Sequence, residues 1–146
     1  MSLAADPGQA RGHAVLIVED DALVAKFYRM ALERAGGFAC LLTENIQEML
    51  EAVESGRVQV AVLDVSLRST EWQGRPIDGV ELTRLLKRRA LARTGQPFPV
   101  LLATAHAMAG DRERLLAASG ADDYLEKPVY DVQELVAKVR HLVASA

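Results

Sequence analysis

VLIVEDD, residues 15–21, joins a continuous apolar run directly to three acidic side chains. Apolar residues that follow one another without alternation are typical of a strand buried on both faces, as in the parallel sheet of an α/β protein. The runs at residues 58–63 and 98–103 have the same character. A run at residues 38–42 and a weak one at residues 123–125 complete a set of five expected strands.

Helical patterns lie between these runs. Residues 46–53 and 132–139 place apolar side chains at i, i+3, i+4 and i+7, the spacing of one helix face. A shorter stripe covers residues 82–86, and another consists of Leu23, Phe27, Met30 and Ala31. Strict alternation of strand and helix predicts a parallel sheet with helices on both faces. The compact solution is an α/β, doubly wound, flavodoxin-like (βα)5 domain with strand order 2-1-3-4-5.

Acidic and amide side chains mark the helix starts. Asn45, Asp78 and Asp131 each precede a glutamate by three positions, which is a capping-box-like arrangement. We expect each of their side-chain oxygens to accept a hydrogen bond from a free backbone N–H group of the first helical turn. Asp21 is expected to cap the first helix in the same way rather than to bind a metal ion.

The composition is that of a globular domain. Half of the 146 residues are hydrophobic, and the net charge is −3 with both signs scattered along the chain. No basic block suggests direct nucleic-acid binding, and no polybasic amphipathic stretch suggests a membrane surface. The single cysteine excludes an intramolecular disulfide framework. We expect a flexible tail at residues 1–13, one domain at residues 14–146, no membrane span and a cytoplasmic location.

Polar side chains follow four of the five predicted strands. Glu19 and Asp20 follow the first, Asp64 the third, Thr104 the fourth and Lys127 the fifth. The carboxyl ends of parallel strands meet at one edge, where ligands bind. Carboxylates crowded there raise one another's pKa unless a cation neutralises them, and Mg²⁺ is the usual hard cation for oxygen ligands. A lysine and a hydroxyl add donors for a phosphoryl group, so the set predicts a phosphoryl-transfer site.

Four segments together resemble the receiver domain of two-component response regulators. They are VLIVEDDALV (residues 15–24), VAVLDVSL (60–67), LLATAHAMAGDRE (101–113) and GADDYLEKPV (120–129). The resemblance extends from about residue 14 to residue 143, nearly the whole chain. It implies that Asp64 is the nucleophile that forms an acyl phosphate, and that Mg²⁺ is the cofactor.

The resemblance also implies roles for the surrounding residues. Glu19, Asp20 and Asp64 would hold Mg²⁺ together with the backbone carbonyl of Ser66. Thr104 would be the switch hydroxyl that bonds the phosphoryl group, and Lys127 would pair with a phosphoryl oxygen.

Three further expectations come from the same resemblance. Tyr124 would be the aromatic side chain that turns inward on activation. Ser66 and His106, each two positions past a catalytic residue, would tune how fast the acyl phosphate hydrolyses. The Lys127–Pro128 peptide bond is expected to be cis, which proline makes inexpensive.

The resemblance implies a signalling switch rather than an enzyme with an external substrate. A histidine kinase or a histidine phosphotransfer protein would donate the phosphoryl group, and the domain would catalyse only its own phosphorylation and dephosphorylation. The surface of the fourth helix, fifth strand and fifth helix would then change for an unknown downstream protein. We expect a monomer or weak dimer with no direct nucleic-acid or membrane partner. The alternative is a phosphorylation-independent protein-interaction module on the same fold.

The segment after Asp64 departs from the family pattern. Arg68 stands where the family commonly has a proline, and the Asp78–Gly79 pair that opens the next helix comes late. The extra polar stretch, residues 68–76, contains Trp72. Loops beside an active site are where binding specificity tends to reside. We therefore predict that this segment shapes access by the phosphoryl donor.

Overall fold

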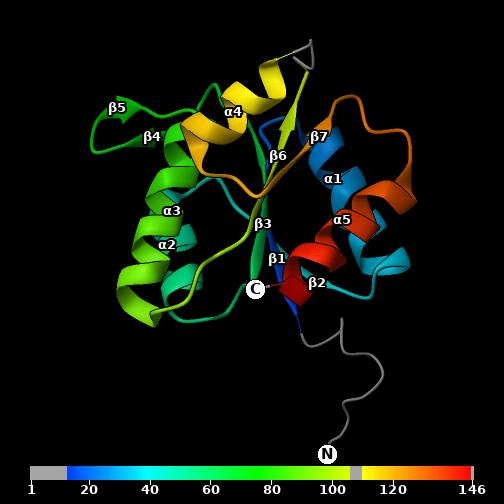
Figure 1. Ribbon diagram of the computed structural model, residues 1–146, viewed down its shortest axis with the longest axis horizontal. Coiled ribbons are helices and arrows are strands. Elements are labelled where there is room, and N and C mark those ends of the chain that lie inside the picture. The colour runs from blue at the N-terminus through cyan, green and yellow to red at the C-terminus, as the bar shows by residue number, and fades with distance from the viewer. Residues whose placement is uncertain (1–12, 106–109, 146) are drawn as a thin grey trace, which may run out of the picture.

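A five-stranded parallel sheet forms the centre of the computed structural model, which describes residues 13–105 and 110–145 (Figure 1). Its strands, in spatial order, are β2 (Ala39–Leu42), β1 (Ala14–Val18), β3 (Val60–Asp64), β6 (Val100–Thr104) and β7 (Asp123–Glu126). All neighbouring pairs run parallel. The predicted doubly wound order is therefore confirmed.

Helices cover both faces of the sheet. Figure 1 shows α2 (Ile46–Glu54), α3 (Gly79–Thr94) and α4 (Asp111–Ser119) on one side. The other side carries α1 (Ala22–Met30), its π-helical continuation η3 (Ala31–Ala35), and α5 (Val132–Ser145). Each face has its own hydrophobic core, as expected of a sheet buried on both sides.

Strand β1 shows how the continuous apolar runs serve two cores. Leu16 and Val18 belong to the core beneath α2 and α3, whereas Val15 and Ile17 belong to the core beneath α1 and α5. Successive side chains of a strand point to opposite faces, so a strand between two cores needs apolar residues at every position. Strands β3 and β6 are buried along their full length for the same reason.

Side-chain caps fix where the helices begin. Asp21 Oδ1 accepts hydrogen bonds from the backbone N–H groups of Leu23 (3.0 Å) and Val24 (3.2 Å). The other three predicted caps, Asn45, Asp78 and Asp131, each accept a hydrogen bond from the backbone N–H of the glutamate three positions later. Because these helices start close to strand ends, the caps also fix the loops at the carboxyl edge of the sheet.

The predicted core stripe of the first helix is partly wrong. Leu23 is 80% exposed and Met30 also lies at the surface, whereas Ala31 is buried as expected. The buried face of the helix consists instead of Ala25, Tyr28 and Leu32, which fall at i, i+3 and i+7. The helix is therefore rotated relative to the expected stripe so that the large Tyr28 ring packs in the core.

The extra segment after Asp64 is a β-hairpin rather than an irregular loop. Strands β4 (Glu71–Trp72) and β5 (Arg75–Pro76) pair antiparallel across a turn at Gln73 and Gly74. Both turn residues have positive φ, 55° and 81°, as a tight hairpin turn requires. Trp72 is half-buried and packs against the core beneath α2 and α3.

No helix within residues 13–105 and 110–145 is long and apolar enough to cross a membrane. The expected flexible tail lies outside the described residues apart from His13.

Gly79 is the position at which the start of α3 meets the end of β3. A Cβ atom built there would lie 2.7 Å from Val65 Cα and closer still to the carbonyl oxygen of Asp64. We therefore expect Gly79→Ala to lower the free energy of unfolding by about 1–3 kcal/mol, because the clashing atoms are backbone. Guanidinium unfolding curves would measure the loss.

The matched control is Ala92→Ser, an equally small change on the exposed side of the same helix. It should alter the free energy of unfolding by less than about 0.5 kcal/mol. Equal stability of Gly79→Ala and the wild type would contradict the close packing of α3 on β3.

Candidate functional site

An acidic pocket of about 450 Å³ opens at the carboxyl edge of the sheet. Five predicted site residues line it, at or just after the ends of three strands: Glu19, Asp20, Asp64, Ser66 and Lys127. Asp21, Arg68 and Ala105 complete the lining. The structure thus brings together the side chains that the sequence placed at separate strand ends.

The three carboxylates form one cluster. Glu19, Asp20 and Asp64 each offer an oxygen, and these oxygens lie within 4.8 Å of one another. Glu19 and Asp64 are buried, while Asp20 is half-buried. Burial raises the pKa of Glu19, and its hydrogen bonds with Lys127 and the backbone N–H of Asp21 only partly offset that effect. A hard cation with oxygen ligands fits this donor set, and Mg²⁺ is the one that such carboxylates commonly hold.

Lys127 supplies positive charge to the cluster. Its Nζ lies 3.0 Å from Glu19 Oε1, to which it donates a hydrogen bond, and 3.3 Å from Asp64 Oδ2. Burial alone would lower the pKa of Lys127, but the hydrogen bond with Glu19 and the charge of Asp64 outweigh it, so the pKa lies above its ordinary value. The ammonium group is therefore charged at neutral pH. The predicted cis Lys127–Pro128 bond is confirmed.

The backbones of Thr104 and Ser66 form hydrogen bonds with residues of the acidic pocket. Thr104 is the buried last residue of β6, and its carbonyl oxygen accepts a hydrogen bond from the Lys127 backbone N–H at 2.7 Å. The Ser66 backbone N–H donates to Asp64 Oδ1 at 3.2 Å. The predicted tuning residue His106 lies outside the described residues.

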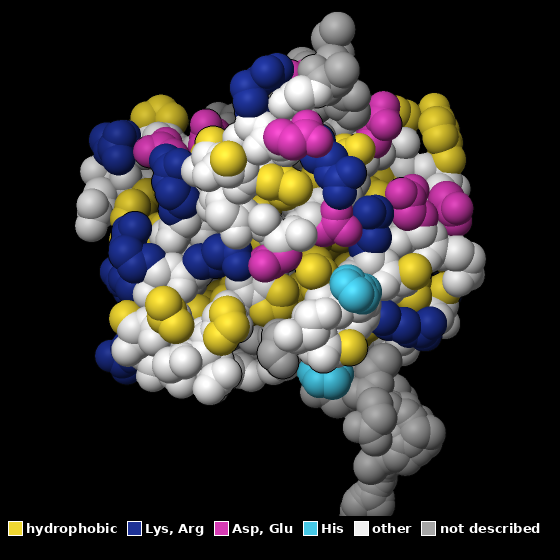
Figure 2. Space-filling model, viewed as in Figure 1, with side chains coloured by type: hydrophobic (Ala, Val, Ile, Leu, Met, Phe, Trp, Pro, Cys, Tyr) yellow, Lys and Arg dark blue, Asp and Glu magenta, His cyan; other side chains and the backbone are white. Residues whose placement is uncertain are grey.

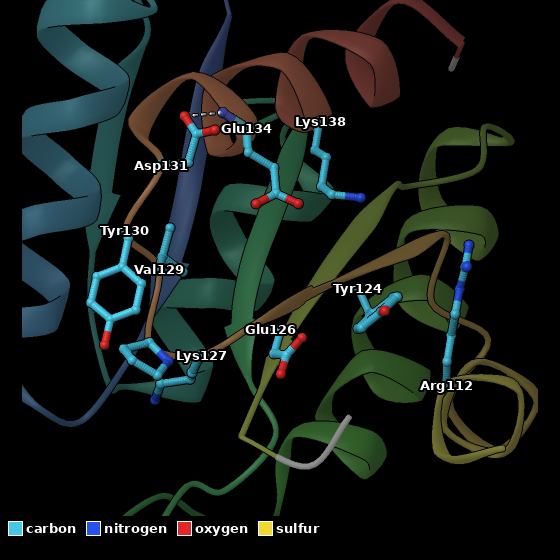
Figure 3. A pocket seen from close by; sticks show the side chains of 10 residues that line it. Arg112, Tyr124, Glu126, Lys127, Val129, Tyr130, Asp131, Glu134 and Lys138 are labelled. Atoms are coloured by element: carbon cyan, nitrogen blue, oxygen red, sulfur yellow. Dashed lines mark hydrogen bonds between the residues drawn. The ribbon is translucent and has the colours of Figure 1, made fainter. Parts of the chain in front are cut away.

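Tyr124 lies away from the carboxylates, in a second pocket of about 520 Å³ (Figure 3). Its ring is between the Arg112 guanidinium, 5.1 Å from the ring centroid, and the Lys138 ammonium, 5.9 Å from it. Cations over an aromatic face are attracted to it, so both help to hold the ring in this position. Lys127 lines this pocket as well as the acidic one, and it therefore connects the two.

Two contributors to the site were missed from the sequence. The backbone N–H of Arg68 donates to Asp20 Oδ2 at 2.8 Å, so the start of the hairpin segment holds a predicted metal ligand. The Tyr28 hydroxyl is fully buried without a hydrogen-bond partner among the described residues. Burial raises the pKa of Tyr28, and the charges of Glu19 and Asp64 raise it further. The Arg68 contact could not be predicted because its donor is the backbone, which does not depend on residue type. Tyr28 could not be predicted because it lies among apolar residues of a helix and follows no strand.

Comparison with known proteins gives one consistent result. The family model of the response regulator receiver domain matches residues 15–140. The chain is 34% identical over 129 residues to response regulator MprA of Mycolicibacterium vanbaalenii, covering 88% of this chain and 49% of that protein. It is 33% identical to the phosphate regulon transcriptional regulatory protein PhoB of Pseudomonas aeruginosa, covering 88% and 51%. The chain thus spans about half the length of these curated relatives.

A solved structure agrees with these relatives. The receiver domain of the sensor histidine kinase PA1611 from Pseudomonas aeruginosa superposes with a TM-score of 0.68 and is 26% identical, covering 90% of this chain and 98% of that one. That receiver was solved with a magnesium ion coordinated in its active-site cleft.

The burial of Glu19 among like charges leads to a stability prediction. Glu19→Gln removes a charge whose ionisation the fold disfavours, and its amide oxygen can still accept from Lys127. We expect the variant to unfold in EDTA at the same or a higher guanidinium concentration than the wild type. Its gain in stability on adding MgCl₂ should be smaller, because a cation stabilises the fold according to its affinity.

Glu51→Gln on the exposed face of α2 is the matched control and should respond to MgCl₂ like the wild type. A Glu19→Gln protein that gains as much from MgCl₂ as the wild type would rule out a role for Glu19 in cation binding.

Proposed function

The chain belongs to the response regulator receiver domain family, and on that premise we propose that Asp64 accepts a phosphoryl group from a partner phosphohistidine. The observation that carries the proposal is the contact geometry of Asp64. This buried carboxylate has the Lys127 ammonium group at 3.3 Å on one oxygen and the Ser66 backbone N–H at 3.2 Å on the other. Both neighbours are donors suited to phosphoryl oxygens.

In the proposed reaction an oxygen of Asp64 attacks the phosphorus of the phosphohistidine. The P–N bond breaks, the imidazole leaves with its electron pair, and an acyl phosphate forms. Glu19, Asp20, Asp64 and the carbonyl of Ser66 would hold Mg²⁺, which when bound offsets negative charge on the transferring oxygens. The protein's contribution is positioning and charge neutralisation rather than acid–base chemistry.

Lys127 provides the proposed route from modification to output. The new phosphoryl oxygens compete with Glu19 for the ammonium group of Lys127. Thr104 supplies a hydroxyl at the end of β6, the strand next to β7. Because Lys127 also lines the pocket of Tyr124, its movement alters the surface of α4, β7 and α5. We call the residues that line the pocket in Figure 3 the α4–β7–α5 surface; they include Arg112 of α4, Tyr124 and Glu126 of β7, and Glu134 and Lys138 of α5. Two arrangements of this surface would constitute the switch.

The proposed partners follow from this chemistry. A histidine kinase or histidine phosphotransfer protein supplies the phosphoryl group, and a downstream protein binds the switched surface. The protein is a signalling switch, and its own chemistry is limited to gain and loss of the phosphoryl group. A phosphorylation-independent interaction module on the same fold is the competing interpretation, and labelling experiments separate the two.

Acetyl phosphate with MgCl₂ should label the wild type and leave Asp64→Asn unlabelled, because the amide cannot act as the nucleophile. EDTA should suppress labelling of the wild type. Phosphate-affinity gels or intact-mass measurement provide the readout. Asp122→Asn is the matched control and should be labelled normally, because Asp122 lies just before β7, at the opposite edge of the sheet, where it pairs with Lys87 and accepts from the Val100 N–H.

Labelling of Asp64→Asn would refute Asp64 as the acceptor. Failure of the wild type to be labelled by acetyl phosphate or by any phosphohistidine protein would favour the interaction module.

The switch can be tested without turnover. Beryllofluoride with MgCl₂ mimics the phosphoryl group, and hydrogen–deuterium exchange should then change in residues 111–138, which include α4 and β7. Thr104→Ala should bind the mimic with a much smaller exchange response, because the hydroxyl that follows the phosphoryl group is missing. A response confined to α2 and β2 would contradict the proposed output surface.

A further inference from the structure

A third recess lies between the β4–β5 hairpin and α3, outside the acidic pocket. Its volume is about 230 Å³. One wall is a single face of α3, on which Glu81, Arg84, Leu85 and Arg88 fall at i, i+3, i+4 and i+7. The other wall is the hairpin, which contributes Trp72, Gln73 and Arg75. We call this recess the hairpin pocket.

The hairpin pocket carries excess positive charge in a protein whose net charge is −3. Three arginines and one glutamate line it. Arg75 approaches Glu81 at 3.9 Å, and Arg84 donates to the backbone carbonyl of Ala118, which is uncharged. Among residues 13–105 and 110–145, no carboxylate forms an ion pair with Arg84 or Arg88.

The positive charge is local rather than a continuous basic stripe. Two other cations of α3 are already neutralised, since Lys87 pairs with Asp122 at 2.7 Å and Arg89 pairs with Glu54 at 2.9 Å. Figure 2 shows the Lys and Arg side chains at the left of the molecule as separate groups, interrupted by acidic and apolar side chains. A duplex nucleic acid needs a row of phosphate contacts, and this arrangement offers a single recess.

The hairpin pocket also has an apolar wall, and it is already formed without a bound partner. Trp72 is half-buried, and Ile77 and Leu85 at the base belong to the core. The hairpin is held by its turn and by the hydrogen bond from the Ile77 N–H to the Thr70 carbonyl at 3.1 Å. Tryptophan and arginine are enriched at protein interfaces, where they dominate the binding energy. A preformed pocket avoids the entropic cost of ordering it on binding.

We propose that the hairpin pocket binds an acidic segment of a protein partner. Carboxylates of the segment pair with Arg84 and Arg88, and an adjacent apolar side chain packs on Trp72. The bound segment thereby contacts the hairpin, and the chain just before the hairpin reaches the acidic pocket, where the backbone N–H of Arg68 donates to Asp20. Binding does not require phosphorylation, so the inference stands apart from the proposed phosphoryl transfer.

The chain contains its own reporter for this test, since Trp72 is its only tryptophan. The probe is a twelve-residue peptide of Asp and Glu with one central Leu, and the control peptide replaces the acids with Asn and Gln. The acidic peptide should shift Trp72 emission saturably in the micromolar range, and calorimetry should give the same affinity. Binding should weaken with added salt, because surface charge pairs are screened.

Arg88→Glu and Arg88→Gln should each lower the affinity at least about tenfold, a loss of about 1.4 kcal/mol. The matched control is Arg93→Glu, an exposed arginine of the same helix that does not line the pocket. Its affinity should stay within twofold of the wild type. Arg88 is exposed, so unfolding curves should show these variants folded. Asp64→Asn should bind the peptide like the wild type, which separates this inference from the phosphoryl-transfer proposal.

Three results would each overturn the inference. The first is the absence of any acidic-peptide binding by calorimetry. The second is an equal loss in Arg88→Glu and Arg93→Glu, which would indicate general attraction rather than a site. The third is tighter binding of duplex DNA than of the peptide with displacement of the peptide from Trp72, which would identify a nucleic-acid surface.

Discussion

The contact of the Lys127 ammonium group with Glu19 and Asp64 is the interaction on which the arrangement of the sheet edge depends. A parallel sheet brings the ends of β1, β3 and β7 together, and in this chain two of those ends carry buried carboxylates. Two such charges close together would disfavour the folded state without a compensating cation. Lysine supplies that compensation from inside the chain, at distances of 3.0 and 3.3 Å. The site can thus remain acidic and still be compatible with folding.

Most of the fold could be predicted because its signals are local and repeated. Apolar runs without alternation identified strands buried on two faces, and the caps Asn45 and Asp78 identified where helices start. The orientation of the first helix could not be predicted in full, because Leu23 and Tyr28 compete for the buried face and only tertiary packing decides between them. The hairpin was equally hidden, since a turn with Gln73 at positive φ has no strong sequence signature.

The candidate site was predictable to a similar extent. The side chains that follow each strand could be assigned because parallel topology determines where they meet. The backbone bond from Arg68 to Asp20 could not, because every residue except proline carries the same donor. This bond shows that the extra segment is part of the acidic pocket rather than an appendage to it. On the other side, Lys127 lines both the acidic pocket and the pocket of Tyr124, so these two pockets share a residue.

The close approach of Gly79 to the Asp64 carbonyl has a mechanical consequence. The backbone of the central aspartate is clamped between β6, through the Val65 N–H bond to Ala103, and the first turn of α3, through the Gly79 N–H bond to Val65. The main chain at Asp64 is therefore held from both sides, and it has little room to shift when the Asp64 side chain is modified. A phosphoryl group on Asp64, as proposed, would thus be accommodated by the side chains of Thr104 and Lys127 rather than by a shift of the β3 backbone.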